Sequence, residues 1–454
     1  MPRDLSVGSA VEASGMSEAV AGRELSVRGR LKKGLVVLMS GTVIGQFVVF
    51  ASSPLLTRLY DPDSFAVFAV VTSISSILAI VLAFRLEMLI PIAKTHDSAK
   101  ALTSSAIVIA SAIGLILAVP MLFISPWLED ATSLPGLAHW LWIAPITAAA
   151  GTAFQTLNQW AIRISAFGLI ATRSIVRPVS MVAAQLLAGT AGVKLGGLPL
   201  GLFVGEFASA ATMFAKSGLR AMDFRETVKM LRIESKARKS YLAVLSVAGL
   251  LNVAATQVPV LLFAFSFSSY STGQLSLTQK TLAVPVAVVG IAMSQVYINV
   301  ISSAVRDRQA ISATFHKVTA INSVAGLIGG ALIAAFGPPV FEFVFGSEWR
   351  EAGEFARLLA AGMVAQLIAA PISQSLAVLG WARSQLLCDL VRFGGCSGAI
   401  LIVPFVSDSP GAAVLGLSLA MALSYAFQWM VVLLAVKRHD AKLPKPDSVS
   451  ADGV

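Results

Sequence analysis

Apolar stretches of membrane-spanning length recur along this chain, and short polar connectors separate them. Within the stretches, apolar and polar residues do not alternate, as residues 107–110 and 431–434 illustrate, so the pattern predicts helices rather than barrel strands. A helix needs about 20 apolar residues to cross the hydrocarbon core. The twelve expected spans are residues 34–56, 66–92, 101–125, 137–157, 173–193, 198–215, 241–266, 273–300, 315–336, 355–378, 386–406 and 412–436.

The longest and most charged connector divides these spans into two sets of six. Pro54 in the first span and Pro259 in the seventh each precede apolar residues and a short turn, which is a faint echo between the sets. Because many transporters enclose a site between repeated halves, we expect an all-α polytopic membrane protein with two six-helix halves around a central cavity. The expected parts are a disordered tail at 1–33, an N-terminal half at 34–216, a basic loop at 217–240, a C-terminal half at 241–436 and a second tail at 437–454.

The composition agrees with an integral membrane protein. Hydrophobic residues make up 56% of the chain and charged residues 13%, and the mean hydropathy is +0.80. A soluble domain of this composition would expose far too much apolar surface. The tail at 1–33 is polar and lacks the apolar core of a cleavable signal peptide, so we expect the first span to be retained as a helix.

Lysine and arginine are distributed unevenly between the connectors. If the N-terminus is cytoplasmic, 27 of the 34 lie in inner segments, four lie on the outer side and three lie within spans. Because positively charged loops remain in the cytoplasm, both termini and the 217–240 loop are expected there. The net charge of +10 then marks this face of the membrane, and no binding of nucleic acid is expected.

The residues that usually carry catalysis or bind metals show no suitable pattern. Cys388 and Cys396 fall in one apolar span, and the four histidines have no ligand spacing. The sequence contains no phosphate-binding loop, no hydrolase nucleophile motif and no zinc-protease motif. We therefore expect no catalytic residue, no cofactor and no metal ion, and neither an ATP-driven pump nor a hydrolase.

Ionisable residues inside the spans carry the main functional signal, because each costs about 2.5–3.5 kcal/mol at the centre of a helix. Arg85 and Glu87 lie in the inner half of the second span, and Lys280 lies in the outer half of the eighth. At positions i and i+2, Arg85 and Glu87 do not share a helix face, so each is expected to need another partner. For Arg85 and Lys280 we favour a functional role over extension of the side chain to the membrane surface.

Two further positions allow more than one interpretation. Asp389 and Arg392 lie at i and i+3 in the eleventh span, where they either form a local ion pair or contact a substrate. Glu206 lies near the middle of the sixth span, where it either couples transport to a proton or holds neighbouring helices together by a hydrogen bond.

Several segments resemble a known family when they are taken in order. Residues 41–46 and 54–65 resemble the opening of bacterial Wzx-like polysaccharide flippases, which belong to the multidrug/oligosaccharidyl-lipid/polysaccharide exporter superfamily. Residues 84–87 read Phe-Arg-Leu-Glu where the family commonly has Leu-Arg-x-Glu. Departures are Phe84 in place of leucine, Lys280 where arginine is common, and the long N-terminal tail. The resemblance continues through residues 158–163, 285–296, 345–353 and 371–374.

The resemblance implies a flippase of the bacterial inner membrane that serves O-antigen, capsule or exopolysaccharide synthesis. Its substrate would be an oligosaccharide linked to undecaprenyl diphosphate, and its partners would be membrane lipids, a polysaccharide polymerase and a chain-length regulator. The diphosphate needs a cationic path, and arginine binds phosphate oxygens with two parallel hydrogen bonds. We expect Arg85 to be the main phosphate contact, Glu87 to position it, and Arg58, Lys280 and Arg392 to bind substrate as well.

Three other functions remain open at this point. An ion-coupled drug or metabolite antiporter of the same superfamily would have a cavity dominated by acids. Glu206 and Asp389 are the candidate ion-coupling residues of this chain. A glycan polymerase or ligase would normally have a large outer loop, whereas the longest outer connectors here, 126–136 and 337–354, are short. An assembly protein without transport activity would tolerate Arg85→Ala.

Overall fold

The computed structural model describes residues 41, 43–219 and 224–443, and this part of the chain contains helices and no strand. Residues 34–40 of the first expected span and the tail at 1–33 lie outside the described residues. The described part has twelve long helices in the places of the expected spans, which confirms an all-α polytopic fold. They are Val43–Leu59, α2 Pro62–Val81, α3 His96–Thr132, α5 Ile143–Arg163, α6 Phe167–Thr190, α7 Lys194–Lys216, α9 Lys239–Ser266, α10 Ser269–Arg306, α11 Ser312–Phe345, α12 Arg350–Ile372, α14 Ala382–Ile402 and α15 Pro410–Asp440.

Ten spans among the described residues are both long and apolar enough to cross a membrane, so the chain is a multi-pass membrane protein. The helix Val43–Leu59 is shorter, and α6 carries Arg173 and Arg177. Short helical segments connect or extend the spans. They are η1 Leu86–Leu89, α4 Leu137–Trp140, α8 Phe224–Ala237, η2 Ser347–Trp349, α13 Gln374–Val378 and η3 Val403–Phe405.

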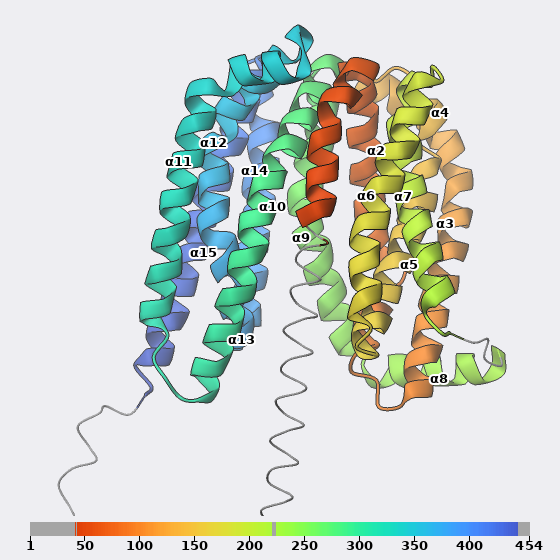
Figure 1. Cartoon of the computed structure of the whole chain (residues 1–454), viewed down its shortest axis with the longest axis vertical. Coiled ribbons are helices and arrows are strands. Elements are labelled where there is room, and N and C mark those ends of the chain that lie inside the picture. The colour runs from red at the N-terminus through yellow and green to blue at the C-terminus, as the bar shows by residue number, and fades with distance from the viewer. Residues whose placement is uncertain (1–40, 42, 220–223, 444–454) are drawn as a thin grey trace, which may run out of the picture.

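The long helices form two bundles side by side (Figure 1). α3, α5, α6 and α7 pack in one bundle, and α11, α12, α14 and α15 pack in the other. α2 of the first bundle packs against both α9 and α10, so these three helices form the seam between the bundles. A functional site between the halves therefore has these helices as its walls.

The seam is tightly packed at the end where α2 begins. A Cβ atom on Gly273 of α10 would lie 1.9 Å from the carbonyl oxygen of Pro62, so only glycine allows this close approach. Phe65 packs edge-on against Trp349, with ring centroids 4.9 Å apart. The Trp349 indole N–H also donates a hydrogen bond of 3.4 Å to the Thr57 carbonyl. The two halves are therefore in direct contact at this end.

The prediction of a second span at 66–92 is wrong beyond residue 81, where the helix ends. α2 begins at a standard cap, with the Asp61 carboxylate accepting a bond of 2.9 Å from the Ser64 amide, and it ends at Val81. Phe84 and Arg85 then have φ angles of 49° and 58°, which are incompatible with a continuing helix.

The segment between α2 and α3 has its own stabilising contacts. Arg163 at the end of α5 donates hydrogen bonds to the carbonyls of Ile90 at 2.8 Å, Pro91 at 3.1 Å and Thr95 at 3.0 Å. Leu89 and Ile90 are fully buried in a cluster with α3. Buried apolar residues of this segment, such as Leu89 and Ile90, therefore pack inside the first bundle, and the segment does not continue the helix α2.

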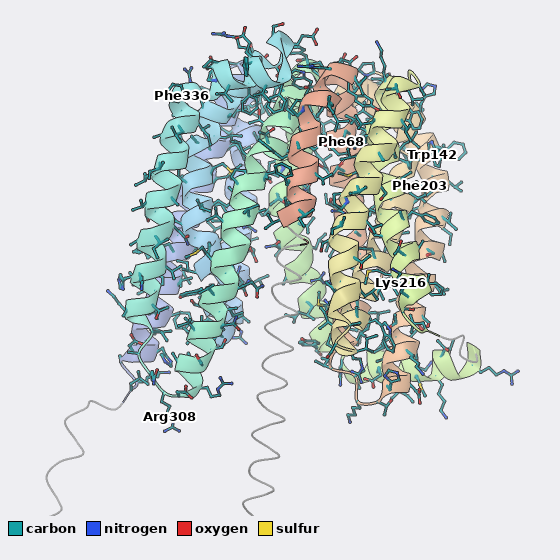
Figure 2. All side chains as sticks on the ribbon, in the orientation of Figure 1. Phe68, Trp142, Phe203, Lys216, Arg308 and Phe336 are labelled. Atoms are coloured by element: carbon teal, nitrogen blue, oxygen red, sulfur yellow. The ribbon has the colours of Figure 1, made fainter. Side chains whose placement is uncertain are left out.

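The connectors lie at two opposite ends of the molecule. Arg308, from a connector expected on the inner side, lies at one end, and Lys216 lies towards that end; Trp142 and Phe336 lie towards the other (Figure 2). The 217–240 segment, expected as a loop, contains α8, which runs crosswise to the bundles at the same end as Lys216 (Figure 1). Which side of the membrane this end faces stays a prediction from the charge distribution.

Candidate functional site

Two adjoining cavities meet at α9, and each is otherwise lined by helices of one half. The first, of about 520 Å³, is lined by α2, α5, α6, α7 and α9, and we call it the N-side cavity. The second, of about 450 Å³, is lined by α9, α10, α12, α14 and α15, and we call it the C-side cavity. Thr256 and Gln257 of α9 line both. The two cavities together form the central cavity of the fold, and amides such as those of Asn158, Gln257 and Gln366 give its wall hydrogen-bonding groups.

An ion pair between Arg177 and Glu206 lines the N-side cavity. The guanidinium Nε and Nη2 atoms lie 2.8 Å and 2.6 Å from Oε1 of Glu206. The Arg177 side chain is 43% exposed and that of Glu206 is 11% exposed, so the cation is the more accessible partner. Gly151 leaves space beside the carboxylate, whose Oε2 atom makes no hydrogen bond to any described residue. The Arg177 guanidinium is therefore the part of the pair that a polar group entering the cavity can reach, whereas the Oε2 atom of Glu206 is buried.

The sequence prediction missed Arg177 because it assigned this residue to the inner connector. α6 begins at Phe167, so Arg177 lies about 15 Å along the helix axis and inside the membrane-spanning part. Glu206 faces it from α7, which packs closely against α6. A buried carboxylate needs a partner. The position of Glu206 inside a span could therefore have predicted a cation on a neighbouring helix.

A second ion pair lines the C-side cavity. Asp389 and Arg392 of α14 contact each other at 3.0 Å, as their i and i+3 spacing predicts. The Arg392 Nη1 atom also donates to the Tyr425 hydroxyl at 3.3 Å, and the guanidinium lies over the tyrosine ring. Asp389 accepts further bonds from Asn252 at 3.4 Å and Gln385 at 3.3 Å. The carboxylate is thus fully engaged below the cavity wall, and the guanidinium forms the wall itself.

Lys280 lies at the seam rather than on either cavity wall. Its Nζ atom is buried, makes no hydrogen bond to any described residue, and lies 5.3 Å and 5.8 Å from the ring centroids of Phe68 and Phe65 on α2. Ring faces attract a cation, but more weakly than a carboxylate would. The ammonium group is therefore held between the two halves with only aromatic compensation.

Arg85 and Glu87 form an ion pair, which the sequence analysis did not expect. Their Nη1 and Oε1 atoms lie 3.3 Å apart, because the backbone turns at Arg85 and the spacing rule for a helix no longer applies. The guanidinium packs on α9, where a Cβ atom at Gly249 would lie 3.2 Å from it. Neither residue lines the two cavities.

Arg58 lies apart from the other candidates, exposed at the end of the helix Val43–Leu59. No group of three or more metal-ligating side chains occurs in the described ranges. Of the candidates from sequence, the structure thus brings Glu206 and Arg392 to the cavity walls, with Asp389 behind the wall as the partner of Arg392. It leaves Arg85 with Glu87, Lys280 and Arg58 at three other places.

Comparison with known proteins identifies the family. The model of the polysaccharide biosynthesis protein family matches residues 55–354. The chain belongs to this family. A search of curated protein sequences finds no match. The family thus links the membrane fold to the synthesis of polysaccharides.

Solved structures show that the chain has a two-lobed fold. It is the fold of the exporter superfamily that the resemblance in sequence implied. The lipid II flippase MurJ in an inward closed conformation is 13% identical, with 90% of each chain covered and a TM-score of 0.69. An inward-facing multidrug resistance MATE family transporter is 12% identical, with 91% of this chain and 98% of that chain covered and a TM-score of 0.60. A superfamily transporter from Pyrococcus furiosus is 14% identical over 90% and 96% of the two chains, with a TM-score of 0.58.

Proposed function

We propose that this member of the polysaccharide biosynthesis protein family is a flippase and not an enzyme. It moves an oligosaccharide linked to undecaprenyl diphosphate from the cytoplasmic to the outer leaflet of the bacterial inner membrane. The family match and the similarity of fold to a lipid II flippase support this proposal. The product supplies O-antigen, capsule or exopolysaccharide synthesis, where a polymerase and a chain-length regulator act on it.

The observation that carries the proposal is the pair of guanidinium groups, one from each half, on the walls of the central cavity. Arg177 and Arg392 are each held by a carboxylate, so their orientation is fixed before a ligand arrives. A guanidinium can bind two oxygens of a phosphate at once. The amide and hydroxyl groups around them suit a sugar, and each guanidinium can contact a phosphate group that enters its cavity.

The other cations extend this path towards the ends of the molecule. Arg85, positioned by Glu87, contributes at the inner end, and Lys280 and Arg58 contribute towards the outer end. The polyprenyl tail stays in the bilayer while the charged head group passes between the halves. In this orientation both termini and α8 are cytoplasmic, as the distribution of lysine and arginine predicts.

An ion-coupled antiporter of the same superfamily is the other candidate. It would have a cavity dominated by acids, whereas the two cavities are lined by the cations Arg177 and Arg392 and by a single carboxylate, that of Glu206. The lining therefore favours an anionic substrate over a cationic drug.

Complementation of a strain that lacks the protein tests the proposal. Arg177→Ala and Arg392→Ala are each expected to reduce surface polymer at least tenfold at equal membrane level of the protein, because each removes a charge-assisted contact worth about 1.5–3 kcal/mol. Arg357→Ala is the matched control. Arg357 pairs with Glu354 at i−3, as Arg392 pairs with Asp389, but it lies outside both cavities. Normal polymer with Arg177→Ala and Arg392→Ala combined would refute the substrate path.

A further inference from the structure

α8 is placed where the surface of a membrane would lie. It follows α7, which ends at Lys216, and precedes α9, which begins at Lys239, so it lies level with the ends of two membrane-spanning helices. It runs crosswise to them and packs against α3 (Figure 1). A helix in this position lies in the plane of the lipid head groups.

Four cations form a stripe along one face of α8. Arg225, Lys229, Arg232 and Lys236 lie at positions i, i+4, i+7 and i+11, which places them within about 60° of one another around the helix axis. All four are exposed. We call them the α8 stripe. Four like charges so close together repel one another unless anions neutralise them, so the stripe is suited to a surface of negative charge.

The opposite face of α8 fixes its orientation. Leu231 packs against the buried cluster of the first bundle. Glu234 is buried beside Arg238, whose Nη2 atom lies 3.9 Å from the carboxylate and donates to the Ile92 carbonyl at 3.1 Å. The α8 stripe is thus directed away from the protein interior and is not used by the fold.

Apolar side chains lie on both flanks of the stripe. Ile233 is 58% exposed and Val228 is 38% exposed. Exposed apolar residues beside a row of cations are typical of helices that bind the boundary between head groups and acyl chains. An acidic protein partner would neutralise the cations. It would not explain why α8 lies in the plane of the membrane surface or why apolar residues flank the stripe.

We propose that the α8 stripe binds the phosphate groups of anionic phospholipids, such as phosphatidylglycerol, at the membrane surface. Each basic residue near an anionic membrane surface contributes about 1 kcal/mol, which is about a fivefold change in affinity. The four together hold the cytoplasmic end of the first bundle and the connection between the halves against the membrane. This inference does not depend on the substrate of the central cavity.

Lipid titration of the purified full-length protein in neutral detergent micelles tests the proposal, with thermal unfolding as the readout. Phosphatidylglycerol is expected to raise the unfolding midpoint more than phosphatidylcholine does. Combined Arg225→Gln, Lys229→Gln, Arg232→Gln and Lys236→Gln substitutions should remove most of this difference. Lys229→Gln alone should raise the apparent Kd for phosphatidylglycerol about fivefold, and it provides a test that does not require the fourfold variant to fold.

A charge-matched control carries glutamine at four exposed cations of the other half, Arg306, Arg308, Lys317 and Arg383. This variant should retain the preference for phosphatidylglycerol, and wild-type protein with inorganic phosphate should show no gain. The proposal is wrong if the two fourfold variants lose the preference equally, if Lys229→Gln leaves the Kd unchanged, or if free phosphate reproduces the effect of the lipid.

Discussion

Gly273 controls how closely the two halves approach each other, and replacing it with alanine should open the seam. The new Cβ atom would lie 1.9 Å from the Pro62 carbonyl oxygen, and contacts shorter than 3.0 Å essentially never occur, so α2 and α10 must separate by roughly 1 Å. Overpacking of this kind costs about 1–3 kcal/mol. We call the arrangement with α2 and α10 in contact closed, and one in which they separate open. If the cost falls on the closed arrangement alone, its population relative to the open one decreases about 5- to 150-fold.

The accessibility of a cysteine on the same face of α10 measures this change. Ser276 is buried, lies three residues beyond Gly273, and accepts the similar side chain of cysteine. In a background of Cys388→Ala and Cys396→Ala, Gly273→Ala should increase the rate at which a charged maleimide labels Ser276→Cys by at least fivefold. Gly290→Ala is the control, because a Cβ atom on that glycine of the same helix meets nothing within 4 Å.

Equal labelling rates for Gly273→Ala and Gly290→Ala would show that the contact between Pro62 and Gly273 does not hold the seam closed. Equal labelling rates together with normal polymer export would mean that α2 and α10 accommodate the new methyl group by a small local rotation. Loss of polymer together with faster labelling is the outcome expected of a transporter that must close this end during its cycle.

Three further predictions concern orientation, the inner cation and energy coupling. Ser235→Cys should stay unlabelled by an impermeant reagent in whole cells, since α8 is expected in the cytoplasm; labelling there would reverse the orientation. Arg85→Ala should abolish polymer export at normal protein level, and Arg85→Lys should recover only part of it, because lysine lacks the two-pronged donor; normal polymer with Arg85→Ala would exclude Arg85 from the path. Glu206→Gln keeps the size of the side chain but cannot titrate, so proton coupling through Glu206 predicts slower flipping in vesicles and no response to an imposed pH gradient. A wild-type rate and response would leave Glu206 with the single role of holding Arg177.

The sequence predicted the number and order of the helices well, because each span must be apolar along its whole length to lie in lipid. It failed after α2 for a related reason. Residues 82–93 are as apolar as a span, yet the helix breaks at Phe84 and Arg85, and most of the apolar side chains that follow, such as those of Leu86, Leu89 and Ile90, are buried inside the protein. Hydropathy does not distinguish a side chain buried in protein from one that faces lipid.

The candidate site was predictable where a local rule applied. Asp389 and Arg392 are one helical turn apart, so their pairing follows from spacing alone. Arg177 and Glu206 are 29 positions apart in sequence and lie on two helices, so their pairing depends on how α6 and α7 pack. The contact of Arg85 with Glu87 was misjudged because the rule that excluded it holds only within a regular helix.

Lys280 gives the closed seam a built-in instability. Among the described residues only the rings of Phe65 and Phe68 compensate its buried ammonium group, and separation of the halves is expected to expose this group to water. The unfavourable desolvation therefore belongs to the closed arrangement and disappears on opening. The desolvation of Lys280 destabilises the closed arrangement, whereas the close packing around Gly273 stabilises it. The closed and open arrangements therefore differ less in free energy than packing alone would make them differ. For the proposed flippase, nearly balanced states would allow a transport cycle without a large input of energy at either step, and Lys280→Met is expected to slow export by making the closed arrangement too stable.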